Sequence, residues 1–229
     1  MVKSTGTVKA INGNMVTVEV NGDVAMNEVG YIKVGEQRLK SEVIRIRGKL
    51  AELQVFEITQ GIGVGDEVEF TGELLAVTLG PGLLGQIYDG LQNPLPSLAE
   101  EAGFFLPRGV YLDALSQDQS WEFTPKVSEG DQVKAADTLG TVPEGAFDHK
   151  VMVPFNFLDT YTVRSVASAG NYKISEKIAE LEDSKGNTHT VTMNFEWPVK
   201  RAITEYEERL KPTEPMVTKV RLIDTFFPV

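Results

Sequence analysis

The feature that most constrains this chain is a two-residue alternation of apolar and polar side chains over its first 72 residues. The stretches MVTVEV, EVIRIRG and AELQVFEIT all follow it. This is the period of a β-strand that is buried on one side only. The apolar positions predicted to face a core are Val16, Val18, Val20, Ile44, Ile46, Leu53 and Val55.

Turn signals divide this region into short strands. Asn-Gly pairs occur at residues 12–13 and 21–22, and both residue types accept the positive φ of tight turns. Strands separated by turns at intervals of about 8 to 12 residues are typical of small closed barrels. Residues 1–72 are therefore predicted to form a barrel of about six strands.

The next segment, residues 73–114, departs from this pattern and is rich in Gly and Pro, as in LGPGLLGQIYDGLQNPLPSLAEEAG. It offers one short helix, predicted over Ser97–Glu101. Ser97 would be the N-cap, and Glu100 lies three residues further on, as in a weak capping box.

Strand signals return from Trp121 to Phe195. SKGN at residues 184–187 predicts a hairpin turn. EKIAELED fits a helix through Ile178 and Leu181, but the turn that follows it favours a strand. THTVTMNF is predicted as one strand, with Val191, Met193 and Phe195 on its apolar face. Trp121 and Trp197 are predicted to seal this core.

The last segment begins with an acidic link, ITEYEERLKPTEP, which is predicted to be helical or extended. Pro212 and Pro215 would end any helix there. The chain closes on TKVRLIDTFFPV, which is unusually apolar for a chain end. We predict that LIDTFFPV is a strand and approach that belong in the core of a larger domain.

The charge balance excludes several classes of protein. There are 22 Lys and Arg against 33 Asp and Glu, a net charge of -11. Such a surface disfavours sequence-independent binding to nucleic acid and to anionic lipid. The absence of cysteine excludes disulfides, thiolate nucleophiles and Cys-based zinc sites. No apolar run approaches the roughly 20 residues that cross a bilayer, so a cytoplasmic protein is predicted.

The glycine-rich segment is the first candidate for a phosphate-binding loop. Such a loop needs a Lys and a Ser or Thr directly after its glycines. Neither Gly80-Pro81-Gly82 nor Gly85 is followed by that pair, and G-x-x-x-x-G-K-[ST] occurs nowhere in the 229 residues. These glycines are instead predicted to form tight turns at a domain junction.

No residue pattern predicts a catalytic, cofactor-binding or metal site. His149 and His189 lie far apart without metal-ligand spacing, and are predicted to be structural or solvated. The carboxylates show no acid–base pair and most simply form a solvated face. Those considered are Glu100, Glu101, Asp113, Asp118, Glu205, Glu207 and Glu208.

One local pattern suggests a different class of protein. VSEGDQVKAADTLGTV and HKVMVP resemble the barrel-sandwich strands of lipoyl and biotinyl carrier domains. Such a domain attaches its cofactor to a Lys at an exposed hairpin, and Lys150 is the only candidate near that place. It lies only four residues before Pro154, and the Met-Lys-Met trio is absent. A shared fold without a prosthetic group is favoured, because fold does not fix function.

Two alternatives from other classes stay open at this point. A free-standing carrier or adaptor would carry a covalent group on Lys150. An oligonucleotide-binding barrel would need basic and aromatic residues on one sheet face. The net charge and the lack of an aromatic strand stripe make the second alternative the weaker one.

A wider resemblance covers nearly the whole chain, from about Thr7 to Val229. LGPGLLGQIYDGLQNPL, WEFTPKVSEGDQV, HKVMVP, WPVKR and RLIDTFFPV occur in the order found in the catalytic alpha chains (type A) of V-type and archaeal rotary ATPases, and the chain resembles that family. Together these motifs are specific, although each alone would be weak. Gln86 departs from the pattern, because related chains often have Arg there.

The resemblance implies a mainly β chain in four parts. Residues 1–72 would be the crown barrel, and residues 73–114 the start of an α/β nucleotide-binding domain. Residues 115–193 would be an inserted bulge domain of barrel-sandwich type, and residues 194–229 a return segment. In the family the phosphate-binding loop follows, so the chain is expected to be an N-terminal piece. Phe226 and Phe227 would pack near the nucleotide pocket.

The resemblance also implies a function for the parent subunit. It would couple ATP hydrolysis or synthesis, with Mg-ATP as its nucleotide, to proton or sodium transport. This piece alone is expected to have no ATPase activity and no catalytic, cofactor-binding or metal residue. Its implied partners are B subunits in an alternating A/B head, the peripheral stalk and central rotor subunits. It would lie at the cytoplasmic face of the membrane without inserting, and would bind no nucleic acid.

Overall fold

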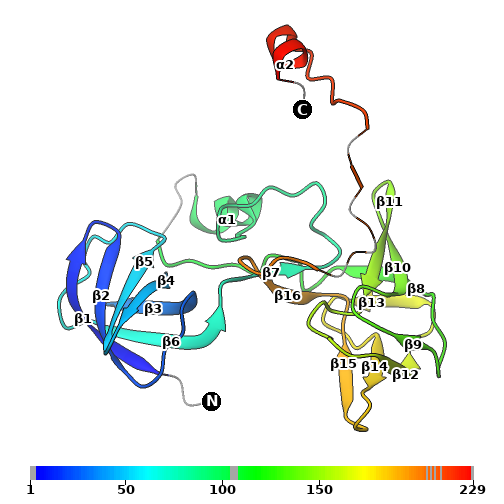
Figure 1. The fold of residues 1–229 in the computed structure, drawn as a ribbon, viewed down its shortest axis with the longest axis horizontal. Helices are drawn as coiled ribbons and strands as arrows, with labels where there is room; N and C mark the ends of the chain where they lie inside the picture. Colours follow the sequence, from blue (N-terminus) through cyan, green and yellow to red (C-terminus); the bar gives the residue numbers. More distant parts are fainter. Residues whose placement is uncertain are drawn as a thin grey trace.

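The chain folds into two β-rich bodies joined by a two-stranded ribbon (Figure 1). The computed structural model describes residues 4–103, 108–204, 206, 208, 210, 211 and 213–227. Strands dominate this part of the chain, which confirms the mainly β prediction. The first body is a barrel on one side of the ribbon, and the second consists of two sheets on the other side.

The first body is a closed barrel with the strand order β1-β2-β5-β4-β3-β6, as predicted. All neighbouring strands are antiparallel. The core contains the predicted Val16, Val18, Leu53 and Val55 together with Phe70, all at most 2% exposed. The strands are β1 (Thr5–Asn12), β2 (Met15–Asn21), β3 (Glu28–Val34), β4 (Gln37–Arg47), β5 (Leu50–Val55) and β6 (Glu67–Leu74).

The predicted inward face of β4 was wrong. Leu39, Ser41 and Val43 are the fully buried residues of β4, whereas Ile44 is half-buried and Ile46 is 36% exposed. The register between β4 and β5 shifts between Val43 and Arg45. Such a shift is typical of a β-bulge, which changes the face to which the following side chains point.

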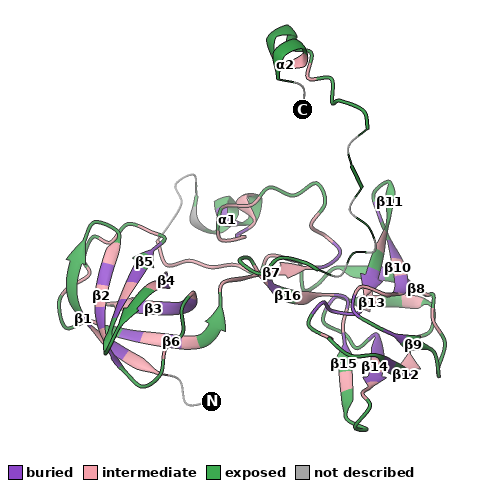
Figure 2. Cartoon of the chain, in the orientation of Figure 1, coloured by how far each residue is buried: buried purple, intermediate pink, exposed green. Residues whose placement is uncertain are grey.

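The second body consists of two four-stranded sheets, ordered β11-β10-β8-β13 and β15-β14-β12-β9. Each sheet contributes to a buried core (Figure 2), and Trp121 lies in the first core as predicted. The strands are β8 (Ser120–Pro125), β9 (Gln132–Val133), β10 (Thr138–Glu144), β11 (Phe147–Met152), β12 (Tyr161–Val166), β13 (Gly170–Lys173), β14 (Ala179–Glu182) and β15 (Thr188–Val191). The strand reading of EKIAELED and the turn at residues 184–187 are confirmed.

The ribbon pairs β7 (Ala76–Leu79) with β16 (Phe195–Pro198), which lies far away in sequence. The two strands are antiparallel, with Leu79 opposite Phe195. The single strand predicted for THTVTMNF is therefore wrong, because β15 ends at Val191 and β16 starts a separate sheet. Trp197 is buried, and its ring lies edge-on to Phe155 with 5.4 Å between ring centres.

The helix α1 (Leu95–Ala102) begins earlier than predicted. Its N-cap is Pro94 rather than Ser97, and no side chain caps it. Proline is tolerated in the first turn of a helix because no intrahelical partner is needed for an N–H there. Pro94 and Pro96 can therefore precede and open the helix, and Ser97 lies within it, exposed.

The closing segment also differs from its prediction. Residues 221–226 form a short helix, α2 (Arg221–Phe226), instead of a strand. None of its residues is buried (Figure 2). No other described segment pairs with it, so its backbone groups are satisfied locally, as in the 3.0 Å bond from Asp224 N–H to Val220 O. Pro212, Pro228 and Val229 lie outside the described residues.

Gly140 on β10 provides a test of core packing. A Cβ there would lie 2.7 Å from Thr124 O and closer still to the Phe123 ring. We expect Gly140→Ala to lower the free energy of unfolding by about 1–3 kcal/mol, the usual cost of overpacking. Gly90→Ala is the matched control, because a Cβ at Gly90 meets no atom within 4 Å. Urea unfolding checks this, and equal stabilities of the two variants would contradict the described packing.

Candidate functional site

The glycine-rich loop that follows β7 is held by Glu144, a buried carboxylate at the end of β10. Glu144 Oε1 accepts hydrogen bonds from Gly82 N at 2.6 Å and from Leu84 N at 3.1 Å. Its Oε2 lies 2.6 Å from His149 Nδ1 on β11. The structure thus brings together two features that the sequence presents separately, the glycine-rich loop and His149.

The alternation of β10 places Glu144 at this point. Val142 and Glu144 point inward, whereas Pro143 between them is exposed. The loop reaches the carboxylate because Gly82 adopts φ +105°, a conformation that disfavours residues with a side chain. Sequence reasoning missed Glu144. The sequence signal that could have found Glu144 is a charged residue at an inward-facing position of a strand. Buried carboxylates are rare unless they are paired, so such a residue predicts a partner.

This arrangement assigns the glycine-rich loop a structural role. The N–H groups of Gly82 and Leu84 point at an anion, as they would in a phosphate loop. That anion is the chain's own carboxylate, which occupies the donors of both residues. The prediction that these glycines form turns at a junction fits this geometry. Among the described residues no group of three or more His, Asp or Glu side chains could hold a metal ion.

His189 lies in a separate cluster around Asp183. The Asp183 carboxylate accepts hydrogen bonds from Lys185 N, Asn187 N and Asn187 Nδ2, and lies 3.2 Å from His189 Nε2. The bonds from Asn187 are the main reason that the pKa of Asp183 lies below its usual 3.8. The rings of Phe157 and Tyr161 flank the imidazole. His189 lies on β15, opposite Leu181, and its imidazole contacts the turn that Asp183 begins.

The remaining candidates do not gather into a site. Lys150 lies within β11, opposite Thr141, and not at the tip of the β10–β11 hairpin. The tip is made by residues 144–147, which contain no Lys, so the geometry of a carrier domain is missing. The other candidates are exposed where they are described: Glu100, Glu101, Asp113, Asp118, Glu208, Phe226 and Phe227. Glu205 and Glu207 lie outside the described residues.

A second junction attaches the barrel to the segment that follows α1. Arg108 Nε donates to Gln37 Oε1 at 2.9 Å, and its Nη1 reaches the carbonyl oxygens of Ile58 and Gln60. The guanidinium thus binds the start of β4 and the loop after β5 at the same time. This uses the fork of donors that only Arg offers.

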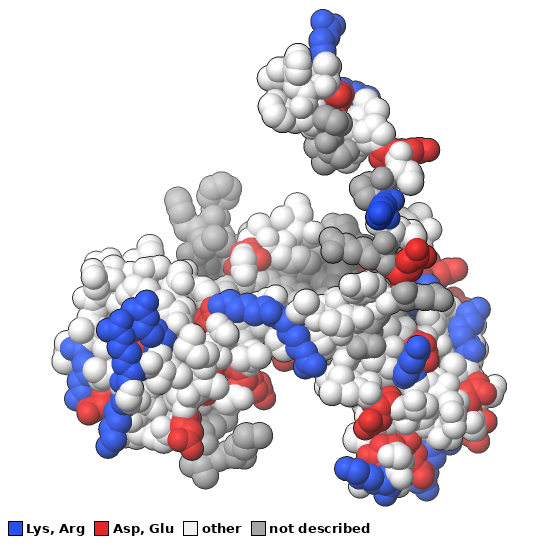
Figure 3. Space-filling view, in the orientation of Figure 1, with Lys and Arg blue, Asp and Glu red and all other residues white. Residues whose placement is uncertain are grey.

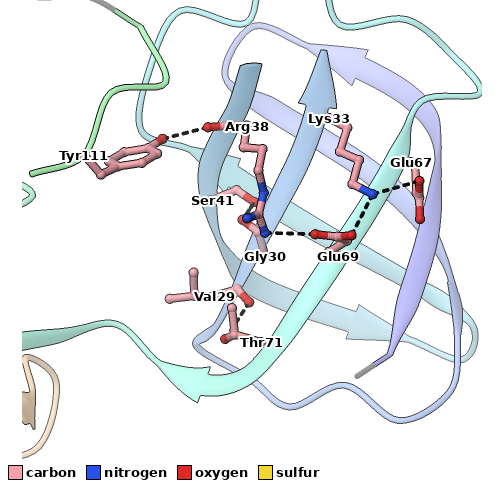
Figure 4. A network of polar contacts seen from close by, with 9 residues as sticks. All are labelled: Val29, Gly30, Lys33, Arg38, Ser41, Glu67, Glu69, Thr71 and Tyr111. Carbon is pink, nitrogen blue, oxygen red and sulfur yellow. Dashed lines mark hydrogen bonds and ion pairs between the residues drawn. The ribbon is translucent and has the colours of Figure 1, made fainter. Parts of the chain in front are cut away.

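Tyr111 completes this attachment (Figure 4). Its hydroxyl accepts from Lys40 N at 2.7 Å, donates to Glu57 Oε2 at 2.5 Å and lies 3.1 Å from Arg38 O. Burial, followed by the bond to Glu57, raises the pKa of Tyr111 well above its usual 10. The hydroxyl therefore remains a neutral donor and holds β4 and Glu57 together. We call Arg108 and Tyr111 the strap.

The face of the molecule shown in Figure 3 carries no patch of a single charge. Acidic and basic side chains are interspersed over both β-rich bodies in the face shown in Figure 3. Several are paired, as in the 2.7 Å contact of Lys9 with Glu19. Among the helices of the described residues, none is long and apolar enough to cross a membrane.

Comparisons with known proteins match both bodies to one family. Residues 8–72 match the model of the ATP synthase alpha/beta family, beta-barrel domain, and residues 112–200 match the ATP synthase alpha/beta subunit barrel-sandwich domain. The V-type ATP synthase alpha chain of Treponema denticola is 62% identical over 229 residues. The alpha chain 1 of Treponema pallidum is 59% identical over the same length, and the alpha chain of Borreliella burgdorferi is 56% identical over 224 residues.

The coverage of these matches is uneven. The two Treponema alignments cover 100% of this chain and the Borreliella alignment covers 98%. In each case the chain spans only 39% of the relative's length.

Glu144 gives a first test of this site. We expect Glu144→Ala to lower the free energy of unfolding by about 2 kcal/mol, because three donors lose a charged acceptor. Glu122→Ala is the matched control, since Glu122 is exposed on the neighbouring strand β8. Chemical denaturation measures both variants. Equal losses for the two would show that Glu144 does not hold the loop.

Asp183 gives a pH-dependent test. Its folded pKa lies below 3.8, so its contribution to stability is complete above that value and is lost as the pH falls through the window below it. We expect Asp183→Asn to flatten the acid side of the stability–pH curve, whereas Asp148→Asn, at an exposed position of β11, leaves its shape unchanged. Urea unfolding at a series of pH values measures this. An unchanged acid limb in Asp183→Asn would contradict the geometry.

Proposed function

We propose a function from one premise: the chain belongs to the family of V-type ATP synthase alpha chains, whose N-terminal portion it matches. The observation that carries the proposal is the alignment of the whole chain with these relatives, at up to 62% identity, together with both β domains in their order. The chain would be a non-catalytic portion of a larger protein that couples ATP hydrolysis or synthesis to transport of protons or sodium ions.

The barrel would provide assembly contacts. In the proposed complex it would meet B subunits in an alternating A/B head. The closed barrel supports this role. Because a closed barrel has no free strand edge, it presents side chains rather than unpaired backbone groups to neighbouring subunits. The strap would hold this barrel against the rest of the parent protein.

The two-sheet body would dock the peripheral stalk. It corresponds to the matched barrel-sandwich domain and lies on the opposite side of the ribbon from the barrel (Figure 1). The lock between Glu144, His149 and the glycine-rich loop supports a fixed orientation for such a docking surface. Contacts with central rotor subunits would fall to the parent complex.

Nucleotide chemistry would belong to other parts of the parent protein. Mg-ATP would bind there, and none of the 229 residues would be catalytic, nucleotide-binding or metal-binding. The parent complex would place this portion at the cytoplasmic face of the membrane, as a peripheral part of the head.

A nucleotide-binding assay tests this division of labour. A ligand at about 100 times its dissociation constant stabilises a protein by about 2.7 kcal/mol, so binding would raise the melting temperature clearly. We expect Mg-ATP to leave the melting temperature of this chain unchanged and expect no steady release of phosphate. A full-length relative is the positive control. Phosphate released at a steady enzymatic rate by the 229 residues alone would contradict the proposal.

A further inference from the structure

The strap is not the only contact that holds the barrel, because β4 is also held from the ribbon. Lys200 lies two residues after the end of β16. Its Nζ is 2.8 Å from Glu42 Oε1 on β4 and donates to Asn27 Oδ1 at 3.1 Å. Two segments far apart in sequence, the strap and the end of the ribbon, therefore both reach this one strand.

Glu42 needs a counter-ion at this position. Its side chain is only 6% exposed, and within the described residues Oε1 has no hydrogen-bond partner. The 2.8 Å contact with the Lys200 ammonium is thus a contact of charges without hydrogen-bond geometry. A carboxylate taken out of water is costly unless an opposite charge lies close to it. Lys200 supplies that charge, and its own side chain is 51% exposed.

The backbone that carries Lys200 is itself fixed. Val199 N donates to Leu75 O at 2.9 Å, next to the start of β7. The only residue between β6 and β7 is Leu75, so this bond lies where the chain leaves the barrel. The backbone before Lys200 is therefore held beside Leu75, and the Lys200 side chain reaches from there to the buried Glu42 carboxylate on β4.

We propose that Lys200 is a positioning residue whose ion pair with Glu42 sets the orientation of the barrel relative to the ribbon. This goes beyond the proposed function, because it does not depend on any partner or nucleotide. Without the pair, the barrel keeps its own core but turns more freely about the short connection at Leu75. The strap then still restrains it, through its contacts at the start of β4.

The absence of cysteine makes the orientation measurable. A pair of spin labels can be attached through Asn12→Cys in the barrel and Glu122→Cys on β8, because both residues are exposed. Pulsed electron paramagnetic resonance then gives the distance distribution between the two bodies in the whole chain. We expect Lys200→Met and Glu42→Gln each to broaden this distribution. Lys9→Met, which breaks the Lys9–Glu19 pair on the barrel surface, should leave it unchanged.

The same variants separate positioning from simple stabilisation. Lys200→Met leaves a buried charge unpaired, so we expect it to lower the melting temperature by about 2 to 4 °C. Adding Glu42→Gln should recover most of that loss while the distribution stays broad. Lys200→Arg, which keeps the charge, should keep the distribution narrow. If Lys200→Met lowers the melting temperature but leaves the distribution unchanged, or changes neither, the proposal is wrong.

Discussion

The pairing of β7 with β16 is the constraint on which the rest of this structure depends. It brings together two segments that are separated in sequence by the whole two-sheet body. The pairing holds the segment before the two-sheet body beside the segment after it. The body between them has two cores of its own. Trp197 anchors the ribbon, packing on Phe155 and donating Nε1 to Arg201 O at 2.9 Å. Glu144 holds the loop that follows β7, and Lys200 extends from the end of β16.

Together these contacts describe a scaffold that uses buried polar groups to fix orientation. Each core is apolar, whereas Glu144 and Glu42 lie at junctions, where each meets a donor or a cation from a segment far away in sequence. Apolar contacts are non-directional, whereas a buried charge is strongly destabilising when its partner is removed. Such contacts suit the bracing role that we propose for this chain.

Sequence reasoning found what depends on local periodicity and missed what depends on distant partners. The alternation at Val16 and Val18 and the turn at residues 184–187 are local, and they predicted the barrel and one hairpin. The prediction that Ile46 faces the core was wrong, because the register between β4 and β5 shifts just before it. Such a shift has no clear signal in the sequence. Glu144 and Lys200 were missed because their partners come from other segments. The closing residues form α2, which belongs to none of the sheets of the described residues.

Residue-by-residue hydrogen exchange on the whole chain tests the central claim, that β7 and β16 form one cooperative ribbon. Amides of residues 76–79 and 195–197 should show similar opening free energies, and both sets should lose protection together in Trp197→Ala. Cooperative units exchange in this concerted way. If β16 exchanged freely while β7 stayed protected, or if Trp197→Ala exposed only one of the two strands, the account would be contradicted.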